Sequence, residues 1–131
     1  MQQMTELLNI ESIVAPQDVG TADVTGSWAD MRRAGRFAVL AQAGACTDGS
    51  EFTVQLRQAT SAAGANAKDL GDPVTVAGVG GAAPEQVVIE HVQGGLDLNG
   101  GLFYVTAVLG VDEDAILGSA WVIRDDNRRS F

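Results

Sequence analysis

The feature of this sequence that most constrains its fold is an alternation of apolar and polar residues over Glu51–Ala59. Phe52, Val54 and Leu56 face one side of an extended chain, and the polar residues between them face the other. This period of two is typical of an antiparallel strand that is buried on one face only. The segment therefore predicts a half-buried β-strand.

Similar signals recur along the chain at a spacing of about ten residues, separated by turn residues. The chain has sixteen glycines and three prolines, and this composition favours short strands with frequent turns. Asn99-Gly100 predicts a two-residue hairpin turn, because Asn and Gly tolerate positive φ angles, and Asp48-Gly49 is a second reversal signal. The other expected strands are Arg36–Ala43, 73–77, 86–92, 102–109 and 115–123. The pattern predicts a mainly-β fold, either an antiparallel β-sandwich or a small barrel.

One internal segment and both ends depart from the alternating pattern. The stretch 59–70 is small and polar, and it predicts one short helix or an ordered loop. We expect extended terminal arms, which divide the chain into an N-terminal arm at 1–18, a β domain at 19–124 and a C-terminal tail at 125–131. Because the N-terminal arm has no partner in the alternating pattern, its removal should leave the domain folded.

The charge of the chain limits its partners. It has 131 residues with 17 Asp and Glu against 8 Lys and Arg, and its net charge is −9. Nucleic acid and anionic membranes attract clustered positive charge, so neither is an expected partner. No secretory signal and no apolar run of about 20 residues is recognisable, which predicts a protein made in a host cytoplasm.

Few residues are suited to catalysis or metal binding. Cys46 is the single cysteine and His91 the single histidine, so neither an internal disulfide nor a multi-histidine metal site can form. Nothing in the sequence brings this thiol and imidazole together as nucleophile and base. The acidic run 112–114 has the character of a solvated turn, and glycines at 78–81 and 94–95 lack the pattern of a phosphate-binding loop. We therefore expect no enzyme activity, no catalytic or metal site, no cofactor and no small-molecule substrate.

Four stretches resemble segments of small virion proteins from tailed bacteriophages. In residues 52–70 an alternating strand ends in Gln-Ala and leads into a glycine-containing loop and a lysine. Residues 23–31 and 36–40 are similar to the strand pair that precedes this segment in such proteins. Residues 123–128 are similar to their charged C-terminal finish.

The resemblance implies a capsid decoration (cement) protein, located on the outer surface of the virion. Such a protein binds the major capsid protein, bridges neighbouring subunits and often works as a homotrimer. Apolar residues of the N-terminal arm, an aromatic residue flanked by small ones, and the cationic and aromatic residues near the C-terminus are the expected interface. These residues are Ile10, Ile13, Val14, Trp28, Arg124, Arg128, Arg129 and Phe131.

Two other interpretations stay open. The chain could be another virion component, such as a head–tail connector or a tail protein, because these share small β architectures. It could also be a ligand- or glycan-binding β-sandwich, which would need exposed aromatic residues on one face. In that case Trp28 is the residue to test.

Overall fold

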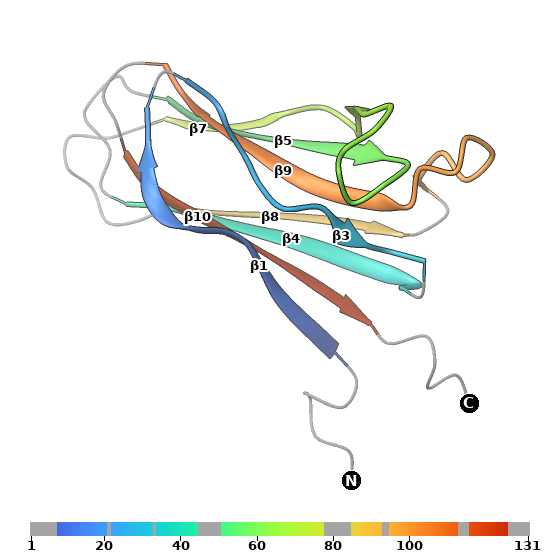
Figure 1. Cartoon of the computed structure of the whole chain (residues 1–131). Helices are drawn as coiled ribbons and strands as arrows, with labels where there is room; N and C mark the ends of the chain where they lie inside the picture. The colour runs from blue at the N-terminus through green and yellow to red at the C-terminus, as the bar shows by residue number, and fades with distance from the viewer. Residues whose placement is uncertain are drawn as a thin grey trace, which may run out of the picture.

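The computed structural model defines residues 8–20, 22–32, 34–44, 51–77, 85–92, 95–112 and 116–125. Within these ranges most residues lie in β-strands and none lies in an α-helix, which confirms the mainly-β prediction (Figure 1). No helix in this part of the chain could therefore span a bilayer. The strands are β1 (Leu8–Val19), β2 (Val24–Thr25), β3 (Ala29–Asp30), β4 (Arg36–Ala43), β5 (Glu51–Ala59), β6 (Lys68–Asp69), β7 (Val74–Ala77), β8 (Glu85–Val92), β9 (Tyr104–Val111) and β10 (Ile116–Asp125).

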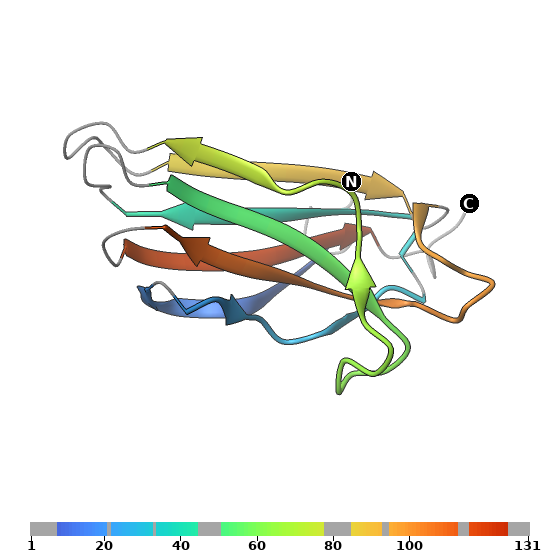
Figure 2. The same ribbon diagram turned by 90° about the horizontal axis from the view of Figure 1, so that it is seen from above.

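The strands form two antiparallel sheets packed face to face. Sheet A has the order β1-β10-β4-β8, and sheet B has β9 and β5 at its centre. The short strands β2 and β3 both pair with β9, and β6 and β7 both pair with β5, so each pair occupies one edge of sheet B. Figure 2 shows the strands of both layers running in roughly the same line, as in aligned sandwiches. The alternative of a closed barrel is excluded by this arrangement.

The order of pairing is that of a jelly roll. When β2/β3 and β6/β7 are each counted once, the described residues provide eight strand positions. The first position pairs with the eighth, the second with the seventh, the third with the sixth and the fourth with the fifth. Such pairing is that of one long hairpin wrapped into two four-stranded layers.

The core lies between the two sheets and is built from the alternation in the sequence. Phe52, Val54 and Leu56 of β5 are buried, and they face Phe37 and Val39 of β4 in the other sheet. The predicted bounds of both strands, Arg36–Ala43 and Glu51–Ala59, are confirmed. Both strands lie inside their sheets and bury one whole face against the other sheet. Buried residues therefore alternate with more exposed ones along their length.

The segment after β5 is an ordered loop and not a helix. Thr60 N donates to Ala65 O over 2.9 Å, and the chain returns to pair with β5 through Lys68–Asp69. Gly64 and Asn66 have φ angles of 79° and 54°. These left-handed conformations reverse the chain and are incompatible with a continuing helix.

The predicted turn at Asn99-Gly100 exists, but it does not close a hairpin. Gly101 N donates to Leu98 O over 3.1 Å, and the positive φ angle of 75° belongs to Gly101. The flanking strands β8 and β9 lie in different sheets, so the turn is part of a crossing between layers. The reversal signal at Asp48-Gly49 lies outside the described residues.

The N-terminal arm prediction is wrong from Leu8 onward, because this segment is an integral strand. β1 pairs with β10 from Leu8 opposite Asp125 to Val19 opposite Ile116. Two register shifts, between Ser12 and Val14 and between Val14 and Gln17, interrupt its alternation and conceal the strand in the sequence. β10 likewise continues through Asp125, the first residue of the predicted tail.

Candidate interaction face

The outer face of sheet B is polar. Thr53, Gln55 and Arg57 of β5 point away from the core. The Thr53 and Thr75 hydroxyls are 3.1 Å apart, and Arg57 Nε lies 3.2 Å from Asp69 Oδ1. This face has the ordinary character of a sheet surface in contact with water.

The outer face of sheet A carries more apolar residues, which lie among the polar Ser12, Gln42 and Ser119. Its strand register places apolar side chains side by side in two rows, because directly opposed residues share a face. One row runs from Ile10 through Ile123 to Ala38, which is paired with Glu90 of β8. The other row starts at Ser12 and runs through Trp121 and Leu40 to Val88. We call this surface the apolar face and define it by Ile10, Ala38, Leu40, Val88, Leu117, Trp121 and Ile123.

Several of these side chains are more than half exposed. The exposed fraction is 58% for Ile10, 59% for Val88 and 61% for Leu117. Figure 1 shows sheet A as the lower layer, and no described segment crosses its outer side. Soluble monomers rarely expose a contiguous apolar patch of this kind unless it contacts another molecule. The apolar face is therefore the candidate functional site.

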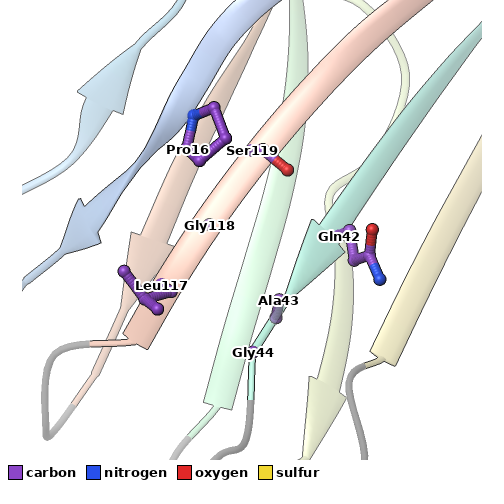
Figure 3. A pocket seen from close by; sticks show the side chains of 7 residues that line it. All are labelled: Pro16, Gln42, Ala43, Gly44, Leu117, Gly118 and Ser119. Carbon is purple, nitrogen blue, oxygen red and sulfur yellow. The ribbon is translucent and has the colours of Figure 1, made fainter.

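One end of the apolar face contains a shallow, open depression (Figure 3). Its volume is about 160 Å³, below the roughly 300–1,000 Å³ of pockets that enclose a drug-sized ligand. The small residues at its floor leave this space between larger neighbours. The lining residues are Pro16, Gln42, Ala43, Gly44, Leu117, Gly118 and Ser119. The depression therefore makes the apolar face uneven and does not enclose a ligand.

Charged side chains pair within the chain rather than across a site. Every lysine and arginine in the described ranges forms an ion pair with a carboxylate of the same chain. The Arg32 guanidinium donates through Nε and Nη2 to the Asp30 carboxylate, and these hydrogen bonds hold the pKa of that carboxyl below its usual value. The same guanidinium lies over the Tyr104 ring. A hydrogen bond from Lys68 likewise lowers the pKa of Asp97. Among the described residues, no group of three His, Cys, Asp or Glu side chains could hold a metal ion.

Arg124 has an internal role instead of the predicted interface role. The alternation along β10 turns its side chain to the inner side, where only 18% of it is exposed. Its Nη2 lies 2.8 Å from Glu11 Oε1 on β1, and its Nη1 donates to Asp30 O on β3 over 2.9 Å. The Arg124 guanidinium of sheet A therefore connects β1 of its own sheet, through Glu11, with β3 of sheet B, through Asp30.

Replacing Arg124 by methionine should lower the free energy of unfolding by about 1–3 kcal/mol, because a partly buried carbonyl and carboxylate lose their donor. Arg36→Met is the matched control, since the Arg36 side chain is 80% exposed and its pair with Asp125 is worth less than about 1 kcal/mol. Urea unfolding followed by circular dichroism measures both. Equal losses in the two variants would contradict the linking role of Arg124.

The structure places the other predicted interface residues in different environments. Ile10 lies on the apolar face, whereas Ile13 and Val14 are buried in the core and are corrected to core residues. Their burial follows from the bulged path of β1 across the sandwich. Trp28 is partly buried and packs against the loop after β5, where a Cβ on Gly64 would lie 2.7 Å from Trp28 Nε1.

Several predicted residues cannot be placed. Arg128, Arg129, Phe131 and Cys46 lie outside the described residues, as does the side chain of His91. The backbone of His91 belongs to β8. The expectation that this thiol and imidazole do not act as a nucleophile and base therefore stays a prediction.

Sequence reasoning missed most of the apolar face. The signal was present in β4 and β10, which carry apolar residues at both odd and even positions. Val39 and Leu40 are adjacent on β4, and Trp121, Val122 and Ile123 are consecutive on β10. A strand that is apolar on both sides is typical of a sheet that is covered on both sides.

Comparisons with known proteins show a similarity of fold and identify no family. No protein-family model and no curated protein matches the sequence. A chain from the structure of infectious bursal disease virus, Gx strain, is similar over 95% of this chain with a TM-score of 0.54 and 8% sequence identity. This chain spans 33% of that viral chain. A subunit of the Bacillus endospore appendages, described as disulfide-linked pili, gives a TM-score of 0.48 at 7% identity, with 92% of this chain and 88% of the other covered.

Proposed function

We propose that this chain is a structural virion protein that attaches to the outer surface of a phage capsid and stabilises it by bridging neighbouring major capsid subunits. The observation that carries the proposal is the apolar outer face of sheet A, with Ile10, Val88 and Leu117 exposed. A surface of this kind gains free energy when another protein covers it. Among the described residues, the depression at one end of this face is open and holds about 160 Å³, less than a pocket that encloses a drug-sized ligand.

The fold supports a structural role in a virus particle. Jelly rolls occur in viral capsid proteins and also in lectins, so the fold alone does not choose between them. The likeness to a chain of infectious bursal disease virus and the resemblance to phage virion segments both favour the virion. The finer proposal, a decoration protein, follows from that resemblance.

The charge of the chain is compatible with an external position. A net charge of −9 keeps an exposed surface soluble and repels packaged nucleic acid. Many copies on one lattice would also make weak individual contacts collectively strong. These arguments support attachment from outside the shell.

The alternative of a glycan-binding module is less favoured by the positions of the aromatic residues. Trp121 lies on the outer face of sheet A, whereas Tyr104 belongs to β9 of sheet B. Trp28 packs against its own loop at Gly64. These three side chains form no common platform for a sugar ring.

The test is binding of purified protein to expanded empty capsids. We expect labelling across the whole shell at a copy number comparable to that of the capsid subunits. Bound capsids should also withstand higher temperature than bare ones. An acidic protein of similar mass is the control for adhesion. Labelling confined to one vertex or to the tail would reject the decoration role in favour of a connector or tail protein, and no labelling would reject the virion role.

A further inference from the structure

The crossing between the two sheets contains a dipeptide with a chemistry of its own. Asn99 and Gly100 lie in the turn that leads from sheet A to β9, and both residues are exposed (Figure 1). The glycine carries no Cβ, so its amide nitrogen can approach the preceding asparagine side chain closely. We propose that Asn99 is a site of spontaneous deamidation and that the ion pair of Asp97 with Lys68 sets its rate. The site is independent of the capsid role.

The reaction needs only these two residues and water. The Gly100 nitrogen forms a bond to Cγ of Asn99 and loses its proton, while the side-chain amide nitrogen takes up a proton and leaves as ammonia. Water then adds to one of the two carbonyl carbons of the cyclic succinimide and opens the ring. One product has aspartate in place of Asn99. The other has isoaspartate, in which the main chain passes through the former side chain.

In the folded chain a hydrogen bond holds the attacking nitrogen. Gly100 N donates to Asp97 Oδ1 over 3.0 Å, and the other carboxylate oxygen, Oδ2, lies 2.6 Å from Lys68 Nζ. The carboxylate also opposes loss of the Gly100 proton, because the resulting anion would stand beside a negative charge. Attack on Asn99 therefore requires the hydrogen bond between Gly100 and Asp97 to open.

The surroundings of the turn allow this opening to be local. Leu102 N donates to Asp97 O over 3.0 Å, and Asp97 N donates to Gln58 Oε1 over 2.8 Å. Leu96 and Leu102 are buried at the two ends of the turn, whereas residues 98–100 between them are exposed. Exposed segments with few buried contacts open at a lower free energy than core strands. Deamidation is therefore expected without unfolding of the whole chain.

Asn66 provides an internal comparison in the neighbouring loop. It is also exposed, but Ala67 follows it, and the Cβ of that residue hinders the approach of its nitrogen to the asparagine side chain. The Asn66 Nδ2 also donates to Thr60 Oγ1 over 3.2 Å, which restrains the amide. These two exposed asparagines therefore differ in the residue that follows them, and Asn66 should react far more slowly.

Deamidation changes the turn in two ways. A second carboxylate arises near Asp97, and the two negative charges compete for Lys68, the only lysine in the sequence. Isoaspartate also inserts an additional atom into the main chain between Asp97 and Leu102, where the hydrogen bond from Leu102 N closes the turn. We therefore expect the modified protein to unfold at a lower temperature than the fresh protein.

The first test is peptide mass spectrometry of the full chain after incubation at mildly alkaline pH, with peptic digestion in acid to stop the reaction. We expect the mass increase of amide-to-carboxyl conversion at Asn99, together with released ammonia, and no change at Asn66 over the same interval. The chain unfolded in guanidinium chloride gives the rate without the hydrogen bond, and the folded chain should react more slowly. An Asn99 amide that stays intact in the folded chain while it is converted in the unfolded one would overturn the proposal.

Two variants test the role of the ion pair. Asp97→Ala should raise the rate at Asn99 by on the order of tenfold, because it frees the Gly100 N–H and keeps the backbone hydrogen bonds. Lys68→Met should raise the rate by about two- to fivefold, since it removes an exposed ion pair. Arg36→Met is the matched control, because it removes an exposed ion pair elsewhere. Unchanged rates in the first two variants would contradict the restraining role of the pair.

Two further readouts separate a local effect from general unfolding. The rate at Asn66 should stay slow in each variant, and a parallel rise at both asparagines would attribute the acceleration to unfolding of the whole chain and contradict the local opening. Asn99→Gln keeps an amide that closes a larger ring more slowly, so its unfolding temperature should not fall during the incubation. A native chain that keeps its unfolding temperature after complete conversion would contradict the effect on the crossing.

Discussion

A chain that begins at Val19 is expected not to fold. The deletion removes Ile13 and Val14 from the core, and burial of each such side chain contributes about 1.5–3 kcal/mol. It also removes every pair of the ladder between β1 and β10 except Val19 with Ile116, and it leaves the Arg124 guanidinium without Glu11. These losses are comparable to the total stability of about 5–15 kcal/mol typical of a domain.

The measurement is a comparison of two truncated chains by circular dichroism, thermal unfolding and sedimentation. The chain that begins at Leu8 retains every residue of β1 and should unfold cooperatively near the temperature of the full chain. The chain that begins at Val19 should lack a cooperative transition and aggregate. Cooperative folding of the shorter chain would show that β1 is a dispensable arm, as the sequence predicts.

Replacing Phe52 by alanine should lower the free energy of unfolding by about 3–5 kcal/mol, because it opens a large cavity between the sheets. Phe52 is fully buried on the central strand β5. Its ring reaches toward Gly118 of β10 in the opposite sheet, where an added Cβ would lie 3.3 Å from Phe52 Cε2 and 2.8 Å from Val19 Cγ2. The missing side chain at Gly118 thus provides room for the aromatic ring.

A double-mutant cycle tests this relation. Gly118→Ala alone should cost about 1–3 kcal/mol through overpacking. In the Phe52→Ala background the added methyl group gains space on the side of the ring, while its 2.8 Å approach to Val19 Cγ2 remains, so the same change should cost less, with a coupling of about 0.5–1 kcal/mol. Urea unfolding of the four proteins measures the cycle. Simple additivity would show that Phe52 and Gly118 do not share this space.

The fold class and the central strands could be predicted because their signals are local. Phe52, Val54 and Leu56 alternate without interruption, and the predicted limits of β4 and β5 agree with the structure. The nature of β1 could not be predicted, because its two register shifts break the alternation around Val14. The paired residues of β1 and β10 lie about 100 residues apart in the chain, and no local pattern contains that pairing.

For the candidate site, too, local sequence predicts some residues and long-range strand pairing decides the others. The sequence predicted Ile10 as a contact residue from its apolar character, and the structure places it on the apolar face. It also predicted Arg124, whose side chain on the inner side of β10 instead donates to Glu11 of β1 and to Asp30 O of β3. Val88 and Leu40 become neighbours of Trp121 only when β8, β4 and β10 pair.

By itself, the sequence determined that this chain forms short antiparallel strands, because side-chain alternation and turn residues act over a few neighbouring positions. Only the tertiary structure decided which strands pair, which residues enter the core, and that one sheet keeps an apolar outer face. Those properties depend on contacts between distant segments, and the free energy of such contacts is defined only once the layers have formed.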